Sequence, residues 1–209
     1  MSKLERLAQW FANQPRWRIV VFALFAWGIP YFLNNHFSLW QPRTLPLFSG
    51  EEDIPFLAWT LPIYLSVALQ VSLGMWFLPK RVFGRGMLSG LLILFIHNLI
   101  FLFYPTSLPR PTVIEPLPAF LQICHKIILW VDAPQNCFPS LHVAMAVLVA
   151  LAWCEVRIWK GLAFFLWAFL IALSTLTTKQ HYIVDVMGGF TMSFLVYYLF
   201  FCHWKKNWP

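Results

Sequence analysis

The chain has 209 residues, of which 60% are hydrophobic and 11% are charged, whereas soluble domains have about 25% charged residues. It contains twelve Trp and twenty-one Phe, and a domain of this size still exposes much of its surface to its surroundings. The composition therefore excludes an ordinary soluble domain and indicates a protein whose outer surface is covered by lipid.

Six apolar runs follow one another along the chain, separated by polar segments. They cover residues 17–36, 54–78, 87–104, 141–153, 162–178 and 183–202. A spanning helix needs about 20 residues, so six spans leave no room for a separate soluble domain. We predict an all-α integral membrane protein with six transmembrane helices in one bundle, forming a single domain over residues 1–209.

Basic residues gather in every second segment between the runs. The N-terminal tail, the 79–86 loop, the 154–161 loop and the C-terminal tail together hold eleven basic and two acidic residues. The remaining segments hold four basic and six acidic residues. Because cytoplasmic loops are enriched in Lys and Arg, we expect both termini to be cytoplasmic. This topology accounts for the net charge of +7, so no nucleic-acid partner is expected.

Two long segments on the other side, residues 37–53 and 105–140, are rich in proline and aromatic residues and are expected to lie along the membrane interface. The second contains Cys124 and Cys137, which either form a disulfide or remain buried thiols. The two other cysteines, at the inner ends of spans, are expected to stay reduced. The spacing of cysteines and histidines does not suggest zinc, and no metal or cofactor is predicted.

Ionisable groups near membrane depth are costly, which makes them candidates for function. Three polar clusters lie at the outer ends of spans. They are residues 104–111 (YPTSLPRP), 136–142 (NCFPSLH) and 174–185 (STLTTKQHYIVD). Together they bring an Arg, a Lys, two His and an Asp to one side of the membrane, so we expect a single site there.

Two of these clusters have a spacing with a chemical meaning. His181 and Asp185 are four residues apart, which places them on one face of a helix. The carboxylate can then fix the imidazole tautomer and make the other ring nitrogen a better nucleophile. Pro139 and Ser140 are typical of a helix start, so the amides from Ser140 to His142 are expected to face an anion.

The same side of the membrane carries two cations. Arg110 offers a planar fork of donors that suits phosphate oxygens, and Lys179 adds a point charge. Two histidines, one aspartate, two cations and a helix N-terminus form a set of groups suited to phosphoryl transfer without a metal ion.

Other polar residues in the spans are interpreted as structural. Asn98 is assigned to helix packing, and Gly188, Gly189 and Ser193 are predicted to form a close helix contact. The remaining histidines are expected to be hydrogen-bonded packing residues, and they are His36, His97, His125 and His203.

The clusters resemble the three motifs of the type 2 phosphatidic acid phosphatase superfamily. The matching positions are Arg110-Pro111, Pro139-Ser140-Leu141-His142, and Ser174 followed at the right spacing by His181 and Asp185. Phe103 and Thr175 stand where that superfamily has a Lys and an Arg. In these features, and in FPSLH and TKQHY, the chain is similar to the branch that contains inositol phosphorylceramide synthase. Lys179 is expected to supply the positive charge that Phe103 and Thr175 lack.

The resemblance implies a role for each group. His181 attacks phosphorus and forms a phosphohistidine, Asp185 orients it, and His142 protonates the leaving oxygen. The groups implied to hold the phosphate are Arg110, Lys179, Ser140 and Ser174. The implied substrate is a lipid phosphate. We expect a multi-pass protein of a bacterial inner membrane or an equivalent membrane, and the charge distribution puts the active site on the non-cytoplasmic face.

Several alternatives stay open at this point. An alcohol acceptor makes the protein a transferase, which the branch-like motifs favour, whereas water makes it a lipid phosphate or pyrophosphate phosphatase. A transporter would also carry charged groups, but as paired repeats or broken helices, and here the groups cluster at one interface. A haem or quinol protein could use the two histidines, although the neighbouring Asp, Arg and Lys suit phosphate better. The lipid, the acceptor and the oligomeric state are not predicted.

Overall fold

The computed structural model describes residues 3–37, 39–110, 117–132 and 134–203, and the regular structure in these ranges is helical. The α-helices are α1 (Lys3–Asn13), α2 (Arg16–Ala23), α3 (Ile29–His36), α4 (Leu61–Phe77), α5 (Lys80–Phe103), α6 (Ala119–Val131), α7 (Leu141–Cys154), α8 (Ile158–Thr177) and α9 (Ile183–Tyr197). A π-helical turn, η1 (Leu24–Gly28), joins α2 to α3, a 3₁₀ turn, η2 (Ala58–Thr60), precedes α4, and a second π-helical turn, η3 (Tyr198–His203), extends α9.

Four helical segments of the described chain are long and apolar enough to cross a membrane. They are Ala58–Phe77, Lys80–Phe103, Ile158–Thr177 and Ile183–Cys202, and they match four of the six predicted spans. With fourteen residues, α7 is shorter, and the first predicted span is helical over 16–36 but is interrupted by η1. The protein is thus a multi-pass membrane protein in outline, and the count of six spans stays a prediction.

The predicted loops on the basic side are partly wrong. The helix α5 begins at Lys80, so most of the predicted 79–86 loop is helical, and α8 begins at Ile158, inside the predicted 154–161 loop. Lys and Arg are good helix formers, and therefore a basic cluster does not by itself end a helix. Pro79, which directly precedes α5, marks its start better than the charges do.

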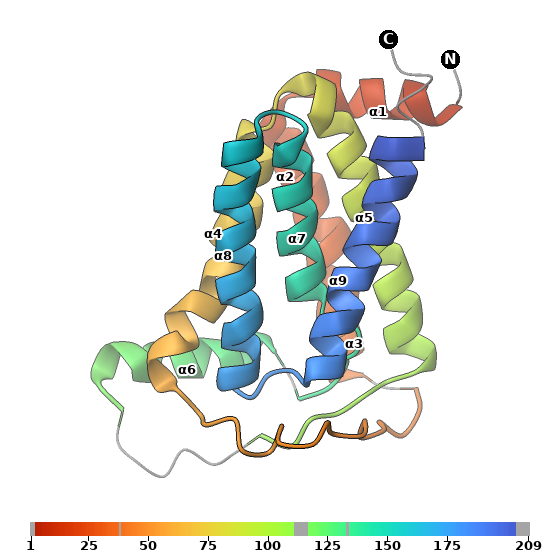
Figure 1. The fold of residues 1–209 in the computed structure, drawn as a ribbon. Coiled ribbons are helices and arrows are strands. Elements are labelled where there is room, and N and C mark those ends of the chain that lie inside the picture. The colour runs from red at the N-terminus through yellow and green to blue at the C-terminus, as the bar shows by residue number, and fades with distance from the viewer. Residues whose placement is uncertain (1–2, 38, 111–116, 133, 204–209) are drawn as a thin grey trace.

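The centre of the bundle is α7, which packs against α4, α5, α8 and α9 (Figure 1). Every residue of α7 is buried except His142 in its first turn and Cys154 at its end. The remaining side chains are apolar all round, as expected for a helix surrounded by protein on every side. His142, the polar side chain at the start of this helix, is only partly exposed, with 15% of its side chain accessible.

The close helix contact predicted at Gly189 and Ser193 is confirmed, and its partner is α7. A Cβ atom on Gly189 would lie 2.6 Å from the carbonyl oxygen of Ser140, so only glycine lets the two backbones approach this closely. One turn further on, the Ser193 hydroxyl donates to the carbonyl of Ala144 at 2.5 Å. These contacts hold the first turns of α7 and α9 side by side.

Two helices lie across the ends of the bundle (Figure 1). At one end lies α1, with the α4–α5 and α7–α8 connections, and at the other lies α6. The α6 helix falls within the 105–140 segment, for which no helix was predicted, and its buried residues Cys124 and Ile128 pack against Leu61 and Tyr64 of α4. A helix of thirteen residues that lies across the bundle is too short to stand out as a span in an apolar segment.

Cys124, Cys137 and Asn98, which were not predicted to take part in catalysis, lie in packing environments. All four cysteines are free thiols, so the disulfide alternative for Cys124 and Cys137 is not the one observed. Burial and the nearby charge of Asp185 raise the pKa of Cys137 above its usual value, which keeps this thiol protonated. Asn98 accepts a hydrogen bond from Asn34 at 2.7 Å, as a helix-packing residue should.

The other histidines also have local partners. Ring nitrogens of His97 and His36 lie 2.8 Å and 2.9 Å from the carbonyl oxygens one turn earlier, at Ile93 and Phe32. The ring of His125 packs edge-on against Phe56. The side chain of His203 lies outside the described part of the chain.

Candidate active site

His181 and Asp185 lie close together, at the end of the bundle that carries α6. The Nδ1 atom of His181 is 3.4 Å from Oδ2 of Asp185, and Asp185 is fully buried. The expectation that both residues share one helix face is wrong, because α9 begins at Ile183 and His181 precedes it. Instead, Asp185 caps the helix start by accepting from the amide of Tyr182 at 2.8 Å, and the connecting turn brings the imidazole back over the carboxylate.

The turn before His181 is a helix C-cap of the Schellman type. The amide of Gln180 donates to the carbonyl of Thr175 at 2.9 Å, and the amide of Lys179 donates to Leu176 at 3.1 Å. The amide of His181 also points to the carbonyl of Thr175, at 3.2 Å. The end of α8 therefore fixes the backbone on which the predicted nucleophile is carried.

Lys179 occupies the position of this turn that usually holds glycine. Its φ angle is +55°, in the left-handed region that costs a residue with a Cβ about 1–2 kcal/mol. Its side chain lines a cavity at the site. A lysine at a position that favours glycine, lining the same cavity as His181, is a reason to look for a functional use of its charge.

His142 lies in the first turn of α7, as predicted. Its ring centroid is 5.8 Å from that of His181, with the two planes at 61°. Ser140 is the N-cap residue of α7 and accepts from the amide of Val143 at 3.4 Å, while its own amide donates to the carbonyl of Asp185 at 3.0 Å. The start of α7 and the start of α9 thus present the two histidines to each other.

A second carboxylate, which the sequence analysis did not select, faces His142. Oδ2 of Asp132, at the end of α6, is 3.5 Å from Nε2 of His142. The hydroxyl of Tyr64 donates to the same oxygen and lies 3.2 Å from Nε2 of His142, and Tyr31 donates to the other oxygen. The site therefore contains two imidazole–carboxylate pairs. Asp132 is separated from His142 by a loop, so no helical spacing in the sequence could reveal the pairing. An acidic residue that directly follows an apolar segment does, however, mark Asp132 as a candidate functional residue.

The surroundings of Asp132 keep it ionised. Burial alone would favour the neutral acid, but the facing His142 and the hydroxyl donors Tyr31 and Tyr64 outweigh it and hold the pKa of Asp132 below its usual value. The side chain of Arg110 donates to the backbone carbonyl of Asp132 at 2.5 Å. Arg110 thus lies beside the His142 pair as well as at the cavity.

The cavity has a volume of about 370 Å³ and contains both signs of charge. It is lined by Leu47, Glu51, Glu52, Ile54, Leu108, Pro109, Arg110, Leu176, Lys179, His181 and Tyr182. Glu51 accepts from the amide of Ile183 at the start of α9 and from the amide of Phe48 at 2.9 Å, which ties the 37–53 segment to the site. Burial and the neighbouring acidic groups raise the pKa of Tyr182, so its phenol stays neutral.

The two serines are placed differently from the cations. Ser174 is buried, and its hydroxyl donates to the carbonyl of Ile171 in its own helix at 2.6 Å, away from the cavity lining. Ser140 is also buried, and its amide donates to Asp185 while its hydroxyl accepts from Val143. The expectation that the Ser140 amide faces an anion is therefore wrong. Phe103, at the motif position of a lysine, ends α5 with its side chain exposed, and Thr175, at that of an arginine, is buried with its hydroxyl on Ala172.

Comparison with known protein families identifies the superfamily of this chain. The family model of the PAP2 superfamily matches residues 54–199, which include all the groups described above except Tyr31, Glu51 and the other lining residues before 54. The chain belongs to the PAP2 superfamily, whose members are generally phosphatases or phosphotransferases. No curated protein and no solved structure matches the chain.

Proposed function

We propose that the protein transfers a phosphate-containing head group from a lipid donor to an alcohol acceptor, through a phosphohistidine on His181. The observation that carries the proposal is the pair of imidazole–carboxylate contacts, with ring centroids 5.8 Å apart, beside a cavity that Arg110 and Lys179 line. One pair suits a nucleophile and the other a proton donor, and two cations suit a phosphate.

In the first step, Nε2 of His181 attacks phosphorus, and the charge that develops on the imidazole is stabilised by Asp185, whose Oδ2 lies 3.4 Å from Nδ1. The bond from phosphorus to the leaving oxygen breaks, and this oxygen takes a proton from His142. Asp132 and Tyr64 contact Nε2 of His142, which leaves Nδ1 as the nitrogen that gives the proton. Asp132 stabilises the imidazolium before transfer, and Arg110 and Lys179 stabilise the charge on the phosphoryl oxygens.

In the second step, the acceptor hydroxyl gives its proton to His142 and its oxygen attacks phosphorus. The phosphorus–nitrogen bond breaks, and His181 returns to its neutral form. The same two histidines therefore serve both half-reactions, with His142 acting first as an acid and then as a base.

Two features favour an alcohol as the acceptor. A cavity of about 370 Å³ holds on the order of a dozen waters, which is more space than a phosphate group needs. Its acidic wall includes the exposed side chain of Glu52, which can accept hydrogen bonds from hydroxyls. The motifs similar to the inositol phosphorylceramide synthase branch support the same choice. Hydrolysis by the same site is the alternative, with water taking the place of the acceptor.

The proposal also covers the membrane arrangement. We place the basic end of the bundle, with α1 and the two short connections, in the cytoplasm, and the site end, with α6, on the other side. The site then receives lipid from the non-cytoplasmic leaflet of a bacterial inner membrane or an equivalent membrane. Ser140 acts by capping the start of α7, which positions His142, and no contact with the phosphate is assigned to Ser174.

The test is an activity assay on the purified protein in lipid vesicles. A panel of phospholipids that differ in head group is offered with and without alcohol acceptors, and free phosphate and labelled lipid products are measured in parallel. Label transfer that depends on the acceptor supports the transferase, and phosphate release alone supports the phosphatase. Absence of both reactions across the panel, in protein shown to be folded, would count against the proposed function.

A further inference from the structure

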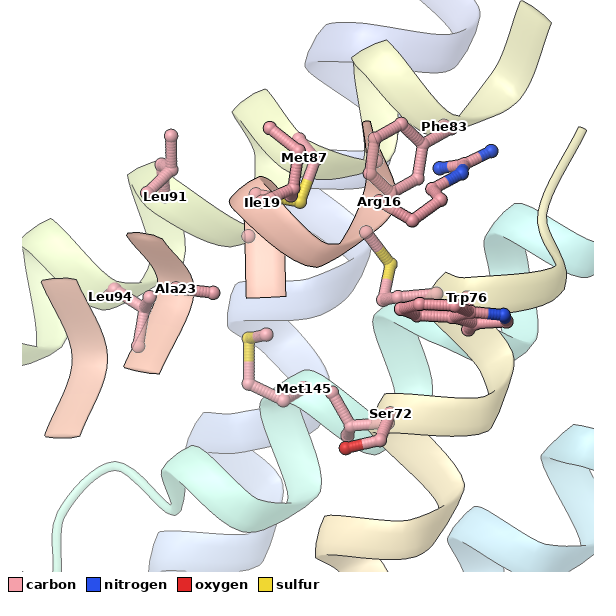
Figure 2. A pocket seen from close by; sticks show the side chains of 14 residues that line it. Arg16, Ile19, Ala23, Ser72, Trp76, Phe83, Met87, Leu91, Leu94 and Met145 are labelled. Atoms are coloured by element: carbon pink, nitrogen blue, oxygen red, sulfur yellow. The ribbon is translucent and has the colours of Figure 1, made fainter. Parts of the chain in front are cut away.

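A second cavity lies between α2, α4 and α5, toward the end of the bundle that carries α1, and Met145 of α7 closes it on the inside (Figure 2). Its volume is about 120 Å³. Its other walls are apolar apart from Arg16 and Ser72, and they include Ile19, Val71, Trp76, Phe83, Met87 and Leu94. Pockets that enclose a whole small molecule usually have about 300–1,000 Å³, so this one suits a segment of a chain.

The walls are built to hold a flexible apolar chain. Met75, Met87 and Met145 come from three different helices, and unbranched thioether side chains adapt to irregular ligands. Gly86 and Gly90 leave the α5 wall without side chains at these two positions. A Cβ atom on Gly90 would meet Met145 at 3.5 Å, an ordinary contact, so the space there is real and could be filled.

One end of the cavity carries a cation. The guanidinium of Arg16 lies 3.5 Å from the ring centroid of Phe83 and donates through one terminal nitrogen to the carbonyl of Leu78 at 2.6 Å. Its other terminal nitrogen is buried and has no hydrogen-bond partner within the described part of the chain. A buried donor without a partner is costly, and an anionic oxygen would satisfy it.

Further features place this cation at a membrane surface. Trp76, beside the cavity, is 45% exposed, and aromatic residues of this kind favour the interface. Lys80 and Arg81 follow Leu78 at the exposed start of α5 and add positive charge near Arg16. Charge and shape together fit a molecule with an anionic head and an apolar tail.

We propose that this cavity binds an anionic phospholipid, with one acyl chain between α2, α4 and α5 and the phosphate on Arg16. The site is separate from the His142–His181 site, and the proposal does not depend on the enzymatic function. Its lipid comes from the leaflet at the basic end of the bundle, where cytoplasmic anionic lipids are attracted by basic residues.

The test is native mass spectrometry of the intact protein, titrated in detergent with phosphatidylglycerol or phosphatidylcholine. Arg16→Gln removes the charge but keeps a polar side chain at the same position. We expect it to weaken phosphatidylglycerol binding about tenfold, as loss of a charged hydrogen bond does, and to leave phosphatidylcholine unchanged. Arg18→Gln is the matched control, because Arg18 is on the same helix but stacks on Trp17 outside the cavity.

Two variants fill the cavity from opposite walls, Gly90→Leu on α5 and Ser72→Leu on α4. Each should reduce phosphatidylglycerol binding with Arg16 intact, and the second variant keeps the test valid if the first does not fold by size-exclusion chromatography. Equal losses in Arg16→Gln and Arg18→Gln would overturn the proposal, as would undiminished binding in both filled variants. Displacement of the lipid by free oleate, or occupancy only in dimers, would assign the cavity to a fatty acid or to a second copy instead.

Discussion

The amide of Ser140 donates a hydrogen bond to the carbonyl oxygen of Asp185 at 3.0 Å. This bond joins the residue that caps α7 to the first turn of α9, and Gly189 keeps the two backbones close beneath it. His142 and His181 each lie within four residues of one end of the bond. Their separation is therefore fixed by the main chain and does not depend on contact between the imidazole rings.

The first prediction separates the two histidines. His181→Ala should form no phosphoenzyme with any substrate, because it lacks the nucleophile. His142→Ala should lose about 10²- to 10⁴-fold in rate, and a nitrophenyl phosphate ester, whose leaving group needs little protonation, should recover part of it. The measurement is acid-labile phosphohistidine trapped by rapid quench, alongside turnover.

His125→Ala is the matched control for these variants, since His125 lies on α6 and is not part of the cavity lining. It should keep both phosphoenzyme and turnover. A phosphoenzyme in His181→Ala but not in His142→Ala would reverse the two roles. Full activity in both variants would remove the catalytic interpretation.

The second prediction concerns Lys179, whose backbone conformation favours glycine while its side chain places a positive charge at the cavity. Lys179→Gly should stabilise the fold by roughly 0.5–1 kcal/mol, because glycine adopts the left-handed conformation without strain. The same change should lower kcat/KM, because it removes a charge from the phosphate site. Thermal unfolding and steady-state kinetics measure the two effects separately.

Lys126→Gly would remove an exposed charge from α6 and serves as the comparison. Glycine inside a helix should destabilise that variant while leaving kcat/KM near wild type. If Lys179→Gly were more stable and equally active, the lysine charge would have no part in the reaction.

The third prediction follows from the ionisation of Asp132. Its pKa in the folded protein is below the usual value of about 3.9, so the carboxylate stabilises the fold above that pH. The stabilisation is lost as the pH falls through the folded-state pKa. Asp132→Asn should therefore melt below the wild type between pH 5 and 7, and the difference in Tm should shrink below about pH 4.

Asp132→Asn should also lower kcat more than it changes KM, because Asp132 acts on substrate only through His142. Tyr64→Phe removes the hydroxyl that bridges the pair and should show the same split to a smaller degree. A KM effect alone in both variants would make Asp132 a binding group instead of a positioning residue.

The fourth prediction is that turnover does not need a divalent metal. Arg110 and Lys179, which line the cavity, supply the positive charge for the phosphate. Dialysis against EDTA should leave activity within about twofold, an expectation drawn from charge-assisted binding by side chains alone. Loss of turnover after chelation, with recovery on adding Mg²⁺, would contradict the mechanism.

The fifth prediction is the orientation in the membrane. Glu52→Cys places a thiol at the site end and Arg81→Cys places one at the basic end, and both positions are exposed. In intact cells, an impermeant maleimide should label position 52 but not position 81. The reverse pattern would show that the site faces the cytoplasm.

The sequence predicted those parts of the protein that depend on local patterns. Four long spans, the helix start after Pro139 and the contact around Gly189 follow from hydrophobicity, capping preference and small-residue spacing. The proximity of His181 and Asp185 was predicted, but from the wrong structure, because the imidazole precedes α9.

The parts that could not be predicted depend on tertiary contacts. Asp132 meets His142 because α6 lies across the bundle on Tyr64, an arrangement that no spacing in the chain encodes. Ser174 matches a family motif, yet its hydroxyl bonds within its own helix. The left-handed backbone conformation of Lys179 could not be predicted either, because it arises from the C-cap turn at the end of α8.

The length of α7 has a consequence for how the protein is made. At fourteen residues it rises about 21 Å, short of the hydrocarbon core of about 30 Å, and it is enclosed by four other helices. Such a segment is a poor candidate for independent insertion, whereas α8 follows after a turn of three residues and is long enough to span. During biogenesis α7 is therefore expected to enter the membrane as a hairpin with α8. The helix that carries His142 then reaches its place only when the surrounding helices assemble.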